Sequence, residues 1–189
     1  MKFDVVHYGD PILRQRGARI DKVDEALRGT IAGMFDTMYE AHGIGLAAQQ
    51  VGLALQLAVI DVRGVRDRPS QLWISGQPAD VDAFMPLVLI NPTIRPVGDA
   101  VGGPEGCLSF PEIYGEVLRP AEVEVQAMND RNELFEFKAG GLLARAIQHE
   151  VDHLNGVLFI DRMDSETRSE VRDEIDALQS ETKKRLKRP

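Results

Sequence analysis

The stretch QHEVDHLNG, from Gln148 to Gly156, contains two histidines and a glutamate at a spacing that can bind a metal ion. In a helix, His149 and His153 lie on one face, about 6 Å apart along the axis, so both imidazoles can reach one ion. Glu150 lies beside that face, where a carboxylate can act as a base on an activated water molecule. The segment predicts a hydrolytic metal site, but two histidines do not complete one.

The third ligand must come from elsewhere in the chain. The zinc-protease pattern that ends in a third histidine fails, because Phe159 stands where that histidine would be. Glu170 and Glu174 lie downstream, where some zinc proteases place a glutamate, although their spacing equally fits the solvated face of a helix. A metalloprotease that uses such a glutamate and cleaves internal peptide bonds is therefore one alternative function.

Cys107 is the favoured third ligand. His7 and His42 have no motif around them, whereas Cys107 lies in PEGCLSFP, where glycine permits close backbone approach and proline stiffens the exit. A thiolate with two imidazoles leaves a fourth tetrahedral position for water, which is typical of catalytic sites. The simpler interpretation of a single cysteine is a small buried hydrophobic residue.

The glycine-rich stretch GIGLAAQQVG, from Gly43 to Gly52, is similar to a dinucleotide-binding fingerprint, but its context is wrong. A predicted helix precedes it and a strand follows it, the reverse of the order that the fingerprint needs. We therefore predict no dinucleotide cofactor. The glycines favour close approach of the backbone to an extended ligand, and Gln50 offers amide N–H donors to a developing oxyanion.

The elements that must position these residues are strands in the middle of the chain and helices at its ends. Apolar residues at helical spacing predict a helix over 24–42, which Gly43 is placed to end. Strands are predicted over 55–62 and over 86–92, the second ended by Asn91 and Pro92. The polar, turn-rich segment between them, 63–83, is predicted to be a long surface loop.

A hairpin with its turn at residues 129–132 is predicted next, because residues alternate in period two on both sides of the turn. Residues 141–156 form the helix of the metal motif, capped by Gly156. Residues 164–184 form a final amphipathic helix that starts near Ser165. The grouping predicts an α+β fold with antiparallel or mixed strands around a central HExxH helix.

Length and charge limit the classes of protein. The 189 residues fit a catalytic domain over 1–164, followed by a C-terminal helix with a basic tail over 165–189. The net charge of −8 argues against a general nucleic-acid binder, although KKRLKR (183–188) adds five cations to an acidic body. We expect no membrane helix and no export signal, and the single cysteine suits a reducing cytoplasm.

Three motifs in order, GIGLAAQQ, EGCLS and QHEVDHLNG, together with YGDPILR near the start, closely resemble the peptide deformylase family. The resemblance covers most of the chain and weakens over 63–85 and in the last two dozen residues. It implies a peptide-deformylase-like fold and a cytoplasmic metallohydrolase of co-translational N-terminal processing. Such an enzyme removes the formyl group from the N-terminal formyl-methionine of newly made polypeptides and releases formate.

The resemblance also implies roles for individual residues. One divalent metal, expected to be ferrous iron with nickel, cobalt or zinc as other occupants, would be held by Cys107, His149 and His153. Glu150 would act as general base and then as acid. Gln50 and the backbone N–H of Leu108 would form the oxyanion hole.

The substrate would lie as an added strand along Gly43, Ile44 and Gly45, which also help to line the methionine pocket. Around the ligands, we expect Asp152 to pair with Arg119, and Glu105 and Gln148 to orient groups that touch the metal. Arg145 departs from the family, where we expect an apolar residue one turn before His149. Its stem either extends past the pocket or narrows it.

Two further possibilities follow from the resemblance. A deformylase-like module that keeps the metal but has lost turnover would be a binding protein instead of an enzyme. The basic tail could also dock on ribosomal RNA near the nascent chain, which would add to the enzymatic role and make 165–189 a ribosome-contacting extension.

Overall fold

The computed structural model describes residues 2–187. Its strands are β1 (Gly45–Ala47), β2 (Leu57–Ile60), β3 (Ser70–Ile74), β4 (Gln77–Pro78), β5 (Leu87–Cys107), β6 (Phe110–Met128) and β7 (Leu134–Gly140). Its helices are α1 (Glu25–Glu40), α2 (Val81–Phe84), α3 (Gly141–Leu154), α4 (Ser165–Glu170) and α5 (Arg172–Leu186). Three short 3-10 helices are η1 (Pro11–Arg14), η2 (Ala48–Val51) and η3 (Phe159–Asp161).

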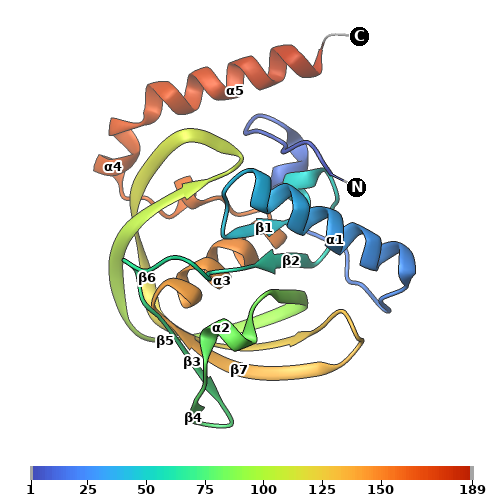
Figure 1. The fold of residues 1–189 in the computed structure, drawn as a ribbon. Helices are drawn as coiled ribbons and strands as arrows, with labels where there is room; N and C mark the ends of the chain where they lie inside the picture. The colour runs from blue at the N-terminus through green and yellow to red at the C-terminus, as the bar shows by residue number, and fades with distance from the viewer. Residues whose placement is uncertain (1, 188–189) are drawn as a thin grey trace.

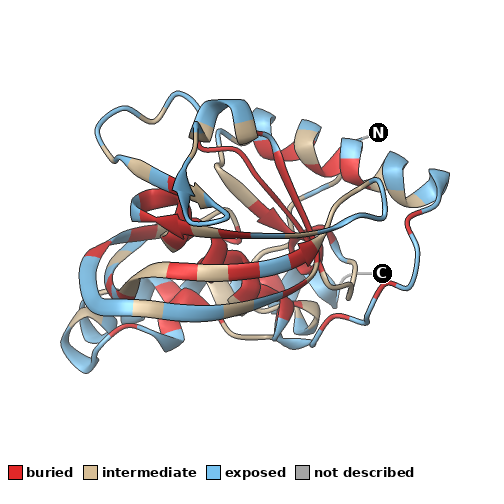
Figure 2. Cartoon of the chain, turned by 90° about the horizontal axis from the view of Figure 1, so that it is seen from below, coloured by how far each residue is buried: buried red, intermediate tan, exposed pale blue. Residues whose placement is uncertain are grey.

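The strands form one antiparallel sheet in the order β1-β2-β5-β6-β7-β3-β4. The sheet curves around α3, while α1 and α5 lie on the outside (Figure 1). Buried residues lie on α3 and on the strands packed against it, and a second buried cluster joins α1 to β2 and β5 (Figure 2). The predicted α+β fold around the HExxH helix is confirmed.

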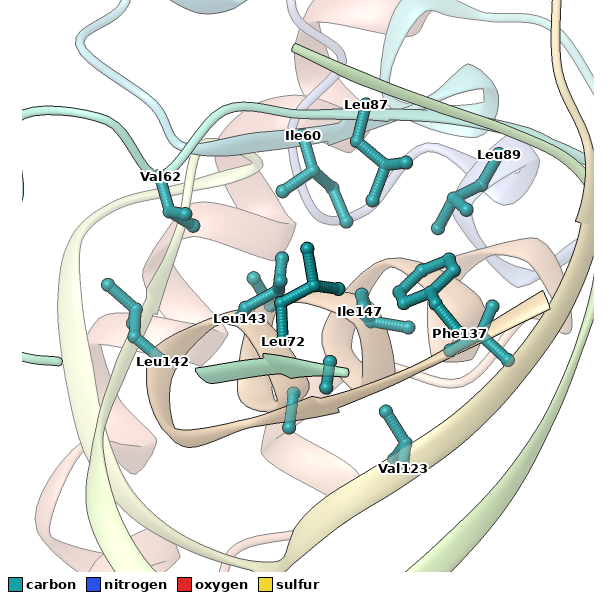
Figure 3. Close-up of a cluster of buried hydrophobic side chains, with 14 of the residues drawn as sticks. Ile60, Val62, Leu72, Leu87, Leu89, Val123, Phe137, Leu142, Leu143 and Ile147 are labelled. Atoms are coloured by element: carbon teal, nitrogen blue, oxygen red, sulfur yellow. The ribbon is translucent and has the colours of Figure 1, made fainter. Parts of the chain in front are cut away.

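The main core holds α3 in place. Leu143 and Ile147 of α3 are fully buried against side chains from several strands, which are Ile60, Leu72, Leu89, Val123 and Phe137 (Figure 3). Removal of this apolar surface from water is the main term that stabilises the helix in the sheet's concave face. At the C-terminal end of α3, Gly156 adopts φ 73°, as its predicted capping role requires. The core and the cap together fix the direction in which the histidine-bearing face of α3 points.

The strand predicted over 86–92 is longer than expected and forms a hairpin with β6. The expected end of the strand at Asn91 and Pro92 is wrong, since β5 continues to Cys107. Asn91 takes φ 50° and the register shifts between Ile90 and Thr93, so a bulge accommodates the proline without a ladder hydrogen bond. The extra length carries Cys107 to the end of the strand, one residue before the turn at Leu108 and Ser109.

The predicted surface loop over 63–83 is also wrong in part. This segment contains β3, β4 and the start of α2, and β3 pairs with β7. Ser75 and Gly76 both have positive φ and form the two-residue turn of the hairpin, while Leu72 is buried in the main core. Trp73 lies under the ammonium group of Lys138, 4.2 Å from its ring centre. The alternation around Leu72 was the signal for this strand.

The C-terminal helix is two helices. Asp164, and not Ser165, caps the first, because its side chain accepts a hydrogen bond from the backbone N–H of Thr167. The helix is interrupted at Val171. In α5, Ile175 then packs against the buried cluster that includes Phe110 and Phe159. Within residues 2–187, no helix is long and apolar enough to span a membrane.

Candidate active site

The three sequence-predicted ligands come together from two elements. Cys107 ends β5, while His149 and His153 lie on consecutive turns of α3. One ligand atom from each of these residues lies within 4.8 Å of the other two, and Cys107 Sγ is 3.3 Å from His153 Nε2. Both histidines are buried. A thiolate and two imidazoles at this separation suit one divalent ion of the zinc or iron type.

The protonation preferences of the two histidines also fit a metal ion. Burial lowers the pKa of His153 well below its ordinary value, which keeps its imidazole neutral as a ligand must be. Burial also lowers the pKa of His149, but contacts with Cys107 and Glu105 outweigh that effect and raise it above its ordinary value. Positive charge is therefore favoured between these groups.

Glu150 lies beside the ligands with its carboxylate against the backbone of β1. A Cβ added at Gly45 would lie 2.3 Å from Glu150 Oε1, so only glycine leaves room for this carboxylate. Its Oε2 is buried and has no hydrogen-bond partner among residues 2–187. Burial raises the pKa of Glu150 to about 7, against the opposing effect of His149. A carboxyl group with this pKa can accept and return a proton near neutral pH.

The amide of Gln50 is held with its donor side toward the ligands. Its Oε1 accepts a hydrogen bond from the Ala47 backbone N–H at 2.9 Å. Its Nε2 therefore points toward Cys107 Sγ at 3.4 Å and Ser109 Oγ at 3.2 Å. Ser109 was not singled out from the sequence, and its place in the turn after Cys107 was the available signal.

A cavity of about 600 Å³ opens in front of these groups. Its lining includes every residue expected to contact the substrate strand or the oxyanion, which are Gly43, Ile44, Gly45, Gln50 and Leu108. A Cβ at Gly43 would lie 2.8 Å from Leu108 Cδ1, so this glycine lets the β5–β6 turn approach β1. His42, Arg68 and Tyr114 also line the cavity, and sequence reasoning assigned them no role.

Glu105 connects His149 to a set of buried ion pairs. Its Oε2 lies 2.9 Å from His149 Nδ1, and its carboxylate is also bound by the guanidinium of Arg119. Arg119 Nη1 in turn lies 2.8 Å from Asp152 Oδ2. Burial raises the pKa of Glu105, but hydrogen bonds from His149 and Arg119 lower it well below its ordinary range. The carboxylate therefore stays ionised beside the imidazole.

Two residues differ in placement from what the sequence suggested. Gln148 Nε2 donates to the backbone oxygens of Pro120 and Ala144, and among the described residues no hydrogen bond joins its side chain to Cys107, His149 or His153. Arg145 does more than line or narrow the pocket, because its guanidinium donates to Glu105 Oε1 at 3.0 Å. Glu170 and Glu174 are exposed on α4 and α5 and lie outside the ligand cluster.

Fold and site together define a metal-dependent hydrolase. The family model described as polypeptide deformylase matches residues 2–169. A curated peptide deformylase of Opitutus terrae is 45% identical over 181 residues, which cover 94% of this chain and 93% of that protein. The chain therefore belongs to the polypeptide deformylase family, and it is an enzyme that removes the formyl group from N-formylmethionine of nascent peptides.

Solved structures agree with this assignment. A plant peptide deformylase crystal structure superposes with a TM-score of 0.84 at 41% identity, covering 99% of this chain and 94% of that chain. A peptide deformylase from Plasmodium falciparum superposes with a TM-score of 0.81 at 33% identity, covering 95% of this chain and 97% of that chain.

Proposed function

We propose that Cys107, His149 and His153 hold one divalent metal ion and that Glu150 moves the proton in deformylation. The observation that carries this proposal is the Cys-His-His cluster, in which both histidines are buried, with the unpaired Glu150 Oε2 at its side. A buried carboxylate oxygen without a hydrogen-bond partner lowers the stability of the fold, so a purely structural role does not explain it. A role in proton transfer beside a metal ion and its substrate does explain the position of Glu150.

We propose ferrous iron as the native metal, in keeping with the family that the motifs resemble. The mixed thiolate and imidazole set also suits nickel, cobalt and zinc. When such an ion is bound, it supplies Lewis-acid chemistry and makes a water molecule acidic enough to lose a proton near neutral pH.

The residues around the ligands perform the remaining steps of the proposed mechanism. Glu150 accepts a proton from the attacking water and returns it to the leaving amine, which frees the new N-terminus and formate. Gln50 Nε2 and the backbone N–H of Leu108 donate to the oxyanion that develops on the formyl oxygen. The orientation of Gln50 supports this role, because its Oε1 is already bound by the Ala47 N–H.

Substrate binding is proposed along β1. This strand lies at one end of the sheet order, so its outer edge is available to an added strand beside Gly43, Ile44 and Gly45. Ile44, Leu142 and Ala146 give the cavity an apolar wall, which suits a methionine side chain.

Formate release from a formyl-Met tripeptide tests these roles, with protein purified without oxygen and loaded with ferrous iron or nickel. Cys107→Ala should lose metal and activity together. Glu150→Gln should keep the metal and lose turnover, since the amide cannot accept the proton. Glu170→Gln is the matched control on an exposed glutamate and should retain activity. An active Glu150→Gln protein would remove Glu150 from the base role, and loss of activity in Glu170→Gln would point to Glu170 as a further metal ligand.

We also propose that the enzyme acts in the cytoplasm and contacts the ribosome through the basic end of α5. Lys183, Lys184, Arg185 and Lys187 are exposed, while Arg188 lies outside the described residues. Packing of Ile175 into the core supports α5 as part of the catalytic domain that presents this basic end. Exposed cations favour binding to a polyanion such as ribosomal RNA, with a strong salt dependence.

Sedimentation with ribosomes at several salt concentrations tests this contact. A triple variant with glutamate at 183, 184 and 185 should bind more weakly at low salt and keep its deformylase activity on free peptides. A protein truncated before Lys183 that binds ribosomes as well as the full chain would refute the contact.

A further inference from the structure

Arg145 lies where the two halves of the metal centre meet. Its side chain leaves α3 one turn before His149 and is only 12% exposed. Its guanidinium makes three hydrogen bonds to the β5–β6 hairpin. Nη1 donates to Glu105 Oε1 at 3.0 Å and to the backbone oxygen of Val117 at 2.9 Å, and Nη2 donates to that of Val101 at 2.8 Å. One side chain of α3 is therefore bound to both strands that lead to and from Cys107.

The backbone of β5 is shaped to receive this guanidinium. A Cβ added at Gly103 would lie 3.0 Å from Arg145 Nη2 and 3.1 Å from its Cζ. Gly103 pairs with Val117 across the hairpin, so the guanidinium lies against the glycine between two carbonyl groups that it binds. Arginine suits this position because its planar fork of donors reaches several fixed acceptors at once.

The contact with Glu105 completes the hydrogen bonding of that carboxylate. An ionised carboxylate has about four acceptor positions. Four donors fill them in this structure, two from Arg119 and one each from Arg145 and His149. With Arg145 and Arg119 on Oε1, the carboxylate has no freedom to turn away from His149 Nδ1. Because Glu105 binds Nδ1 of His149, the Nε2 atom of that ring is left to bind the metal ion.

We propose that Arg145 is a positioning residue that fixes the β5–β6 hairpin against α3, so that Glu105 orients His149 and Cys107 reaches the same metal ion as the two histidines. The inference rests on the proposed metal centre, and it concerns how that centre is assembled. It also gives a reason for the charged residue one turn before His149, since its guanidinium is bound to the hairpin while the residue also lines the cavity.

The test uses Co²⁺-loaded full-length protein, because Co²⁺ bound to a thiolate has a characteristic absorption spectrum. Arg145→Met keeps the length and apolar character of the stem but removes the donors. We expect chelator-driven Co²⁺ loss to be on the order of 10- to 100-fold faster, with an altered spectrum. In the loaded enzyme, kcat should fall while KM for a formyl-Met peptide changes little. Arg145→Lys should have an intermediate effect, since one ammonium group cannot reach all three acceptors.

Arg95→Met is the matched control, because Arg95 pairs with Glu124 on the same hairpin but in an exposed position. It should release Co²⁺ within about twofold of the wild-type rate, as expected for an exposed pair. In a Glu105→Gln background, Arg145→Met should add less than it does alone, because both changes disturb one hydrogen-bonded group. If the effects of the two substitutions on Co²⁺ release are fully additive, Arg145 does not act through Glu105.

Failure of this inference and failure of the metal centre give different results. If Cys107→Ala retains Co²⁺ with the wild-type spectrum, the proposed centre itself is wrong. If Cys107→Ala loses Co²⁺ while a folded Arg145→Met protein releases it at the wild-type rate, the centre stands and the role of Arg145 is overturned.

Discussion

Gly45→Ala is the sharpest test of where Glu150 must lie. The new Cβ would be 2.3 Å from Glu150 Oε1 and 2.9 Å from its Cδ, whereas ordinary contacts begin near 3.4 Å. The carboxylate must therefore move by about 1 Å, a misplacement that can lower a rate on the order of 100-fold. That factor corresponds to ~2.7 kcal/mol in the activation free energy.

Formate release at saturating formyl-Met peptide measures the loss in kcat, and metal analysis of the same samples measures retention of the ion. We expect kcat to fall about 100-fold with metal content unchanged, because the three atoms nearest to the added Cβ all belong to Glu150. Gly29→Ala is the matched control, since a Cβ at Gly29 of α1 meets no atom within 4 Å. It should keep full activity and gain about 1 kcal/mol of stability from the better helix former. Wild-type kcat in Gly45→Ala would show that the position of Glu150 does not limit the reaction.

Three other outcomes are expected. Gln50→Ala should lower kcat by roughly 10²- to 10³-fold in the formate assay with metal content unchanged, as for loss of one oxyanion donor; a drop below tenfold would argue against that role. Leu72→Ala should lower the free energy of unfolding by about 2–5 kcal/mol in urea titrations, because Leu72 is 2% exposed in the core; a loss under about 1 kcal/mol would mean that β3 is not packed as described. Burial raises the pKa of Asp61, but hydrogen bonds from Arg63 and Tyr39 outweigh it and lower the pKa below its ordinary value. The stabilisation that ionised Asp61 provides is fully present above its unfolded-state pKa and is lost as the pH falls through its folded-state pKa. The difference in free energy of unfolding between wild type and Asp61→Asn should therefore be full at pH 7 and should shrink below about pH 4. An equal gap at pH 7 and pH 3 would contradict this reasoning.

Much of the architecture around the site was readable from local sequence. The helix of the metal motif has its apolar residues on one stripe and ends at Gly156, whose φ of 73° suits glycine. The hairpin between β6 and β7 follows from strict alternation on both sides of a polar turn, as predicted. Such signals depend on neighbours within a few residues, so they survive without knowledge of the rest of the chain.

The two wrong predictions concern segments whose conformation depends on residues that are distant in the sequence. Asn91 and Pro92 read as a strand end, but Asn91 bonds the backbone of Ile20 through its side chain and forms a bulge, so β5 continues. The segment over 63–83 read as a polar loop, but β7 offers its edge to β3 and the core accepts Leu72. Neither partner is near in sequence, so no local pattern reveals it.

The sequence by itself determined the types of residue that can bind a metal and move a proton, because two histidines and a glutamate on one helix need only helical geometry to share a face. It also determined that GIG must let other groups approach closely. Only the tertiary structure decided which groups approach. Gly45 admits Glu150, and Gly43 admits Leu108. Arg145 and Arg119 converge on Glu105 from α3 and β6. Contacts between residues so far apart in the chain arise from how α3 packs within the curved sheet, and that packing is a property of the whole core.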